Sequence, residues 1–188
     1  MVEHYKNVKD QAIYGVVHGG VDRKERMKSL DYITSLPFDG VARGGSLGSG
    51  HEELVELLAW LMPEVRKRTT KPVHLLGIAD ERSIREAVKL GVDTFDSCYP
   101  TRLARHGTLL TKAGKVHVKN AKFTKSYGIP IEEGCQCATC KGGYDMAYLN
   151  HLFKSSEVNF VKLAVDHNLM YMGTMMKGIR DDIENGKI

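Results

Sequence analysis

Three cysteines within six residues constrain this chain more than any other feature of its sequence. Cys135, Cys137 and Cys140 form a Cys-x-Cys-x2-Cys cluster, and the stretch from Cys140 to His167 is long enough for a helix to leave and return a fourth ligand. Three thiolates and one imidazole are a standard ligand set for a structural zinc ion. The sequence therefore predicts a closed zinc site that fixes the loop around residues 134–140.

Two alternatives to this zinc site depend on the cellular environment and on the other histidines. A disulfide among the neighbouring cysteines would need an oxidising compartment. The amino terminus lacks the basic and apolar segments of a signal peptide, and no apolar run is long enough to span a membrane, so we expect a cytoplasmic protein with reduced thiols. His151 is the rival fourth ligand, since it also follows the cluster on helical sequence. Cys98 lies elsewhere and is expected to be a buried thiol.

The length and net charge of the chain limit its domain organisation and its possible partners. With 188 residues and 42% hydrophobic residues, the chain can form one globular domain, or one domain and a small satellite. The net charge of +4 favours a polyanionic partner only mildly, because many proteins that never bind nucleic acid are equally basic.

Short apolar runs alternate with amphipathic stretches through the first half of the chain. We expect strands at residues 12–17, 39–42, 72–78 and 92–96, and helices over residues 22–35, 51–68 and 81–90. Such alternation predicts parallel strands with functional loops at their carboxyl ends. A closed (β/α)8 barrel typically needs about 250 residues and twice as many units, so the sequence supplies about half a barrel.

The alternation of expected strands and helices ends after residue 102. Residues 103–133 predict a small hairpin and basic loops, and residues 144–184 predict helices whose apolar positions, including Tyr148, Leu169 and Met170, pack in a core. Five lysines occur between residues 112 and 125 without intervening acids: Lys112, Lys115, Lys119, Lys122 and Lys125. They form either a solvated surface or a polyanion-binding face.

Two carboxylates and two arginines follow the last expected strand. Asp93 and Asp96 lie at its end, where a barrel carboxylate is a nucleophile or base, or caps the following turn. Arg102 and Arg105 are expected in one loop, where they would clamp phosphates or form surface salt bridges.

One segment, Phe95-Asp96-x3-Pro100-Thr101-Arg102, occurs together with the three-cysteine cluster, and this combination is highly specific. Further distinctive segments are residues 14–20, 39–45, 75–78, 91–107, 147–153 and 166–169. With these segments, in family order, the chain resembles the carboxyl-terminal half of the tRNA-guanine transglycosylase (queuine tRNA-ribosyltransferase) family.

The resemblance implies the last four βα units of a TIM barrel, with residues 1–105 as the half-barrel and residues 106–188 as basic loops, a zinc-binding subdomain and carboxyl-terminal helices. It implies a transferase of queuosine biosynthesis that exchanges the wobble guanine of tRNA for a 7-deazaguanine base through a covalent ribosyl–aspartate intermediate. The implied roles are nucleophile for Asp96, tRNA contact for Arg102 and Arg105, base pocket for His18, Gly44, Gly45 and Leu76, and Zn2+ ligation for Cys135, Cys137, Cys140 and His167.

Three departures bear on the base that is used. His18 replaces the usual glutamine, Ser46 interrupts the usual Gly-Gly-Leu, and the usual glutamate has no counterpart in Gly48-Ser49-Gly50. The family's second catalytic aspartate and a base-binding aspartate belong to the earlier half of the barrel. The resemblance thus implies a carboxyl-terminal fragment that is inactive alone.

Other hypotheses stay open at this point. One is a non-catalytic, zinc-containing subunit that binds tRNA or assists assembly. Another is that a second copy of the chain, or the missing amino-terminal half, covers the open sheet edges of the half-barrel.

Overall fold

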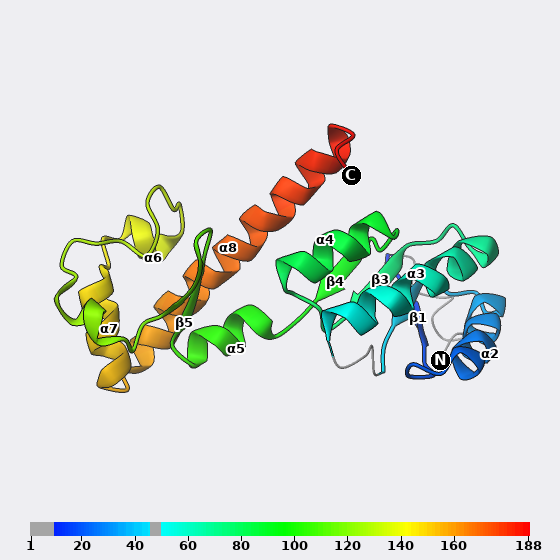
Figure 1. Cartoon of the computed structure of the whole chain (residues 1–188), viewed down its shortest axis with the longest axis horizontal. Coiled ribbons are helices and arrows are strands. Elements are labelled where there is room, and N and C mark those ends of the chain that lie inside the picture. Colours follow the sequence, from blue (N-terminus) through cyan, green and yellow to red (C-terminus); the bar gives the residue numbers. More distant parts are fainter. Residues whose placement is uncertain (1–9, 46–49) are drawn as a thin grey trace. The chain divides into compact units, whose positions relative to one another are not determined.

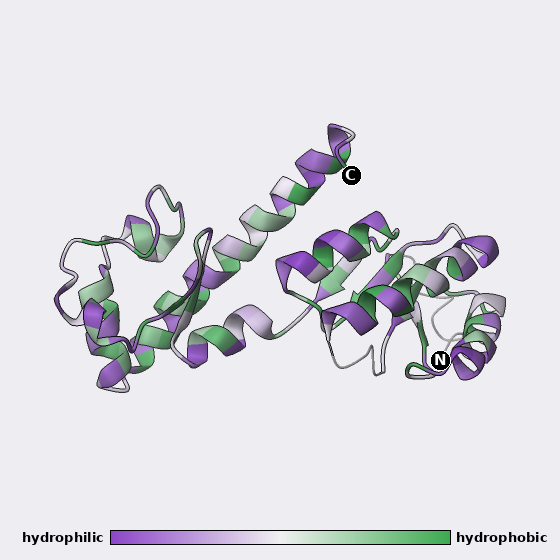
Figure 2. Cartoon of the chain, viewed as in Figure 1, coloured by the Kyte–Doolittle hydropathy of each residue, from purple (hydrophilic) through white to green (hydrophobic). Residues whose placement is uncertain are grey.

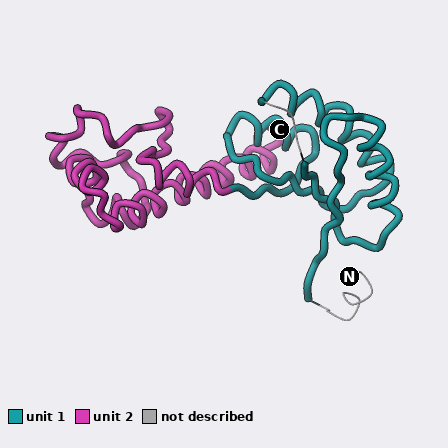
Figure 3. Tube along the Cα trace, turned by 90° about the horizontal axis from the view of Figure 1, so that it is seen from below, with its two compact units in different colours: residues 1–97, 188 teal, residues 98–187 magenta. Residues whose placement is uncertain are grey.

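The computed structural model describes residues 10–45 and 50–188. The chain divides into two compact units, residues 1–97 with 188 and residues 98–187 (Figure 3). The expected polar lead-in therefore lies mostly outside the described residues, as do residues 46–49 of the second glycine-rich turn. No helix in the described ranges combines the length and apolar character needed to span a membrane.

A four-stranded sheet forms the first unit (Figure 1). Its strands, in both spatial and chain order, are β1 (Tyr14–Val17), β2 (Gly40–Arg43), β3 (Val73–Leu76) and β4 (Thr94–Asp96). The connecting helices are α2 (Arg23–Ser35), α3 (His51–Arg68) and α4 (Glu81–Lys89). Each strand pairs with the next in parallel, which confirms the predicted alternation of strands and helices.

One face of this sheet is buried under the three helices. Figure 2 shows hydrophobic and hydrophilic residues side by side along α3, as expected for a helix with one buried face. The core joins alternate strand residues to residues of all three helices: Val17, Leu30, Val41, Leu54, Leu58, Leu61, Met62, Val65, Val73, Leu75, Ala87 and Val92. Because strand side chains alternate between faces, the intervening residues point to the other side of the sheet.

Arg43 is the exception in this core. Its side chain is fully buried, and in the described part of the chain none of its three guanidinium nitrogens has a hydrogen-bond partner. Arg26 is also buried, but its guanidinium donates to the carbonyls of Gly20, Val17 and Gly44. Burial, and secondarily the positive charge of Arg26, lowers the pKa of Arg43 to about 9. A buried, unpaired charge destabilises the fold.

We therefore expect Arg43→Met to raise the free energy of unfolding in urea by about 1–4 kcal/mol, since it replaces the charge by an apolar side chain of similar length. Arg26→Met is the matched control and should destabilise the fold, because it removes the hydrogen bonds that Arg26 donates to the carbonyls of Gly20, Val17 and Gly44. The gain from Arg43→Met should shrink as the pH rises above about 9, where the folded wild-type side chain loses its proton before the unfolded one. A wild-type protein more stable than Arg43→Met at neutral pH would contradict this assignment.

The second unit is built from a hairpin and helices. Strands β5 (Thr108–Thr111) and β6 (Gly114–His117) pair antiparallel, as expected, and are followed by the 3-10 helix η1 (Ala121–Lys125) and helices α6 (Ala138–Lys141), α7 (Met146–Lys154) and α8 (Val158–Glu184). The core of this unit contains Ala104, Leu109, Val118, Ile131, Met146, Leu149, Leu152, Phe160 and Ala164. Tyr148, Leu169 and Met170 are exposed, so the core role predicted for them is wrong.

Helix α5 (Tyr99–Arg105) replaces the loop that the sequence predicted around Arg102 and Arg105. Pro100 lies in its first turn, where a missing N–H costs nothing and a fixed φ favours the helix. The helix ends before Gly107, whose φ is +72° and whose Cα lies against the Phe153 ring: an added Cβ would come within 2.6 Å of that ring. Only glycine satisfies both the left-handed backbone and this close approach.

Asn168 joins three elements of the second unit. Its side-chain oxygen accepts from the amide of Leu110 at 2.9 Å, and its amide group donates to the carbonyls of Pro100 and Thr108, both at 3.0 Å. Asn168 is fully buried, so these bonds are shielded from water. They fix α8 against α5 and β5, and thereby place the neighbouring His167.

Candidate metal centre and strand-end site

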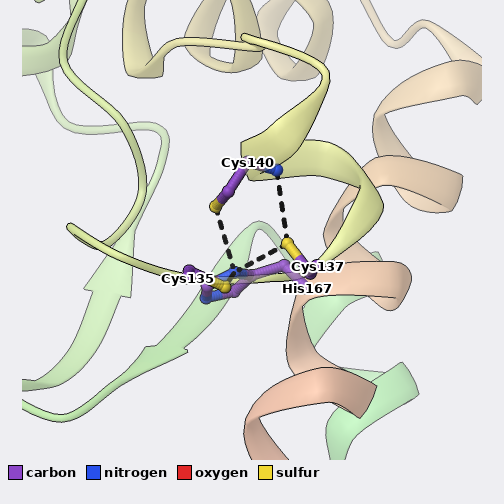
Figure 4. A group of neighbouring side chains, drawn as sticks. All are labelled: Cys135, Cys137, Cys140 and His167. Carbon is purple, nitrogen blue, oxygen red and sulfur yellow. Dashed lines mark hydrogen bonds between the residues drawn. The ribbon is translucent and has the colours of Figure 1, made fainter.

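The three cysteines and His167 converge on one point in the second unit (Figure 4). The Nδ1 atom of His167 lies 3.6 Å from the sulfur atoms of Cys135 and Cys137 and 3.7 Å from that of Cys140. A tetrahedral zinc ion, with bonds of about 2.3 Å to sulfur and about 2.0–2.1 Å to nitrogen, separates these atoms by about 3.5–3.6 Å. The four side chains therefore fit a tetrahedral metal ion.

The local structure presents these ligands from a short loop and two helices. Cys137 is the N-cap of α6, and its sulfur accepts from the amide of Cys140 at 3.3 Å. His167 is fully buried on α8, and its Nε2 donates to the carbonyl of Leu110 at 2.8 Å. That bond places the proton on Nε2, so the Nδ1 lone pair faces the sulfurs. His151 is exposed on α7 and lies outside the cluster.

Burial is the main cause of the pKa shifts in this cluster. Burial lowers the pKa of His167, which keeps the imidazole neutral and available as a ligand. Burial, followed by the neighbouring thiols, raises the pKa of Cys140 to about 12, and burial also raises the pKa of Cys135. A divalent cation would reverse this preference, because it stabilises thiolates that otherwise repel one another. Cys98 is exposed, so the buried position expected for it is wrong.

Asp93 and Asp96 lie at opposite ends of β4. Asp93 precedes the strand, where its carboxylate accepts from the amide of Val73 at 2.7 Å and pairs with Arg66 at 3.0 Å. Asp96 is the last residue of β4, and its side chain is exposed at the carboxyl end of the sheet. Asp93 thus links β3 to β4. Asp96 lies at the carboxyl end of the strands, where parallel α/β proteins carry their active sites.

The residues that the resemblance places around the base lie close to Asp96. Leu76 is the register partner of Asp96 on β3. Gly44 is buried against Leu76, since an added Cβ would lie 3.1 Å from Leu76 Cδ1 and 3.9 Å from His18 Cε1. A Cβ on Gly45 would lie 3.8 Å from Nδ1 of His18. The structure therefore brings His18, Gly44, Gly45 and Leu76 together at one end of the sheet.

His74, a further residue near Asp96, was not predicted from the sequence to belong to this site. His74 of β3 contacts the carboxylate of Asp96, with 3.2 Å between Nε2 and Oδ1. Alternation places the two on the same face, because His74 pairs with Thr94 and Asp96 lies two residues further on. The sequence contained this signal, but only once the register between β3 and β4 is known.

The predicted cations of the second unit are exposed. Arg102 and Arg105 lie three residues apart on α5, so they share one face of the helix. Within the described residues, neither guanidinium has an ion pair, and the same holds for the five lysines of residues 112–125. By contrast, two exposed lysines of the first unit are paired: Lys28 with Glu25 and Lys89 with Glu86.

Comparisons with known proteins agree with the resemblance. The family model described as queuine tRNA-ribosyltransferase matches residues 1–188. A protein of Protochlamydia amoebophila (strain UWE25) named queuine tRNA-ribosyltransferase is 45% identical over 185 residues, which are 98% of this chain and 47% of that protein. Proteins of the same name from Chlamydia abortus and Chlamydia caviae are each 42% identical over 98% of this chain and 49% of their own length. The chain spans about half the length of these curated relatives.

Proposed function

The chain belongs to the queuine tRNA-ribosyltransferase family, and on that basis we propose that it is the carboxyl-terminal part of an enzyme that exchanges the wobble guanine of tRNA for a 7-deazaguanine base. The observation that carries the proposal is the position of Asp96, at the carboxyl end of β4 and beside Leu76 and Gly44. An exposed carboxylate next to a glycine-lined apolar surface is suited to attack on a nucleoside bound there.

In the proposed reaction Asp96 attacks C1′ of the target ribose. A carboxylate oxygen forms a bond to C1′, the bond from C1′ to guanine breaks, and its electron pair leaves with the guanine, which takes up a proton. The incoming base loses a proton, attacks C1′ from the vacated side and returns the electron pair to the carboxylate. Such double displacement divides a difficult glycosyl transfer into two easier steps.

His18, Gly44, Gly45 and Leu76 form the part of the base pocket that this chain contributes. Gly44 lets the backbone approach the base closely, since a side chain there would occupy the space beside Leu76 and Val16. Leu76 supplies an apolar wall, and the imidazole of His18 supplies a polar group at the position of the family's usual glutamine. This substitution changes the hydrogen-bonding pattern offered to the base.

We propose that Cys135, Cys137, Cys140 and His167 bind one structural zinc ion. The ligand set is closed, because four protein groups fill a tetrahedral coordination shell and leave no position for substrate. The sulfur-to-nitrogen distances support zinc over a disulfide, since all three sulfurs surround one imidazole nitrogen. The ion would hold the loop before α6 against α8 and would take no part in the chemistry.

We further propose that residues 1–105 are the last four βα units of a TIM barrel. Four consecutive parallel strands with their helices on one face support this arrangement. In this scheme α5 is the helix after β4, although it packs within the second compact unit, and residues 106–188 are the zinc-binding subdomain with the carboxyl-terminal helices. The half-barrel would be completed by an amino-terminal half, or covered by a second copy of the chain.

The tRNA partner would be held by the unpaired cations of the second unit. We expect the double variant Arg102→Ala/Arg105→Ala to weaken tRNA binding. The logarithm of the association constant should also fall less steeply with the logarithm of the salt concentration, by about 1 in slope for each phosphate that the variant no longer neutralises. Fluorescence anisotropy between about 50 and 200 mM salt measures both quantities. The matched control is Lys28→Ala/Lys89→Ala, which removes two cations already paired with glutamates. A flat salt dependence of the wild-type protein would contradict a phosphate-binding role.

The rival function is a non-catalytic, zinc-containing subunit that binds tRNA or assists assembly. The two functions are separated by joining this chain to the amino-terminal half of the Protochlamydia amoebophila relative and measuring incorporation of labelled base into tRNA. Incorporation that requires Asp96 supports the enzyme. Tight tRNA binding without incorporation or covalent adduct supports the subunit.

A further inference from the structure

His74 lies between Thr94 and Asp96 on the face of the sheet that the helices do not cover. Its Nδ1 atom is 2.8 Å from the hydroxyl of Thr94, and its Nε2 atom is 3.2 Å from Oδ1 of Asp96. The ring also packs edge-on against Tyr14, with 6.3 Å between ring centroids and 74° between the ring planes. The imidazole is therefore held by three contacts.

These contacts determine where the imidazole carries its proton. A carboxylate can only accept, so the contact with Asp96 is a hydrogen bond only if Nε2 carries a proton. The hydroxyl of Thr94 can donate to the remaining nitrogen, Nδ1. The neutral imidazole thus satisfies both neighbours in one tautomer, with Thr94 donating to His74 and His74 donating to Asp96.

A second donor reaches the same carboxylate oxygen. The amide of Gly77 is shared between the backbone carbonyl of Asp96, at 3.0 Å, and Oδ1 of Asp96, at 3.2 Å. Gly77 has a φ of +80°, which glycine adopts without strain. Among the described residues, no hydrogen bond reaches Oδ2 of Asp96. The two oxygens of this carboxylate are therefore unequal, since one is held by two donors and the other is free.

We propose that His74 is a positioning residue that, together with the amide of Gly77, anchors Oδ1 of Asp96 and leaves Oδ2 as the attacking atom. The inference rests on the proposed function, in which Asp96 is the nucleophile. Holding one oxygen fixes the rotation of the carboxylate, so the free lone pair of Oδ2 keeps a constant direction toward C1′.

The same two donors act in both displacement steps. In the first step Oδ2 bonds to C1′, the electron pair of the glycosidic bond leaves with guanine, and a general acid outside the described residues supplies the proton that guanine takes up. Oδ1 becomes the carbonyl oxygen of the ester and keeps its two donors. In the second step the deprotonated nitrogen of the incoming base bonds to C1′, and the ester electron pair returns to the carboxylate. The charge that develops on Oδ1 is then stabilised by His74 and Gly77.

The contact itself can be tested without turnover, in the zinc-loaded 188-residue chain. Two-bond nitrogen–proton NMR spectra distinguish the two imidazole tautomers, and we expect His74 to carry its proton on Nε2. Asp96→Leu should shift the His74 signals toward a mixture of tautomers, whereas Asp93→Leu should leave them unchanged. Spectra of His74 that do not respond to Asp96→Leu would overturn the proposal.

The chemical role is tested in the chimera with the relative's amino-terminal half. His74→Phe keeps a ring against Tyr14 but has no donor, and His74→Gln keeps an amide donor of similar reach. We expect His74→Phe to slow adduct formation at saturating tRNA by roughly 10–100-fold with tRNA affinity unchanged, and His74→Gln to recover most of the rate. A wild-type rate in His74→Phe, or equally slow adduct formation in both variants, would overturn the positioning role. If the wild-type chimera forms no adduct while the spectra show the contact, the proposed function fails and the anchoring of Asp96 stands.

Discussion

Removal of zinc from this chain is expected to unfold residues 98–187 and to leave the first unit folded. The reason is that three of the four ligands come from a segment with little regular structure: Cys135 and Cys137 lie in the loop before α6, and Cys140 lies in α6, which is a single turn. Binding free energies of structural zinc sites are on the order of 10–16 kcal/mol, which exceeds the stability of a typical domain. Hydrogen exchange after chelation should therefore show loss of protection in α7 and α8 and retained protection in α3.

The ligand assignment is tested by a matched pair of cysteine variants. Cys137→Ser should lower the zinc content well below one ion per chain, because the residue is a ligand and also caps α6. Cys98→Ser should leave it at one, since Cys98 is exposed and lies outside the cluster. Full zinc occupancy in Cys137→Ser, or chelation without any loss of protection, would refute a structural metal site.

Zinc uptake should also release protons. Burial raises the pKa of Cys140 to about 12 and raises that of Cys135, so these thiols are protonated in the metal-free chain at neutral pH. Zinc binds thiolates, and each thiolate formed gives one proton to the solution. A weakly buffered solution with a pH indicator should therefore become more acidic on zinc addition, and zinc affinity should fall as the pH falls.

Local pattern in the sequence was enough to predict the first unit. The apolar runs that became β1 to β4 are short and flanked by glycines or acids, and Leu54, Leu57, Leu58 and Leu61 recur at helical spacing and are all buried. Chain spacing also favoured His167 over His151 as the partner of the three cysteines, and His167 is the histidine that lies in their cluster. The strand and helix predictions succeeded because each depends on neighbours within one or two turns or strands.

The remaining features depend on long-range packing, which a single sequence does not show. His74 and Asp96 are 22 positions apart, and only the strand register brings them together. Leu169 and Met170 have the spacing of core residues, but they lie on an exposed face of α8, next to the buried His167 and Asn168. In each case the deciding contact comes from an element that the local pattern does not identify.

In the chimera with the relative's amino-terminal half, Asp96→Asn should abolish covalent trapping of tRNA, whereas Asp93→Asn should retain trapping and lower the stability of the protein. An amide at position 96 cannot form the ribosyl ester, so the adduct on a denaturing gel should disappear completely. At position 93 an amide weakens the bond to the Val73 amide and the ion pair with Arg66, which should lower the free energy of unfolding by about 1–2 kcal/mol. An adduct that survives Asp96→Asn would refute the nucleophile assignment.

The isolated 188-residue chain should show little or no base exchange, even with Asp96 intact. Exchange requires a proton for the leaving guanine and removal of one from the incoming base, and a general acid–base group typically contributes about 10²–10⁴-fold to such a step. Among residues 10–45 and 50–188, the ionisable side chain within hydrogen-bond distance of Asp96 is His74, and its Nε2 proton is engaged by Oδ1. Fusion to the amino-terminal half of the Protochlamydia amoebophila relative should restore incorporation of labelled base, and Asp93→Asn should be active in that chimera. Turnover by the isolated chain at the rate of the chimera would show instead that residues 1–188 contain the whole catalytic apparatus.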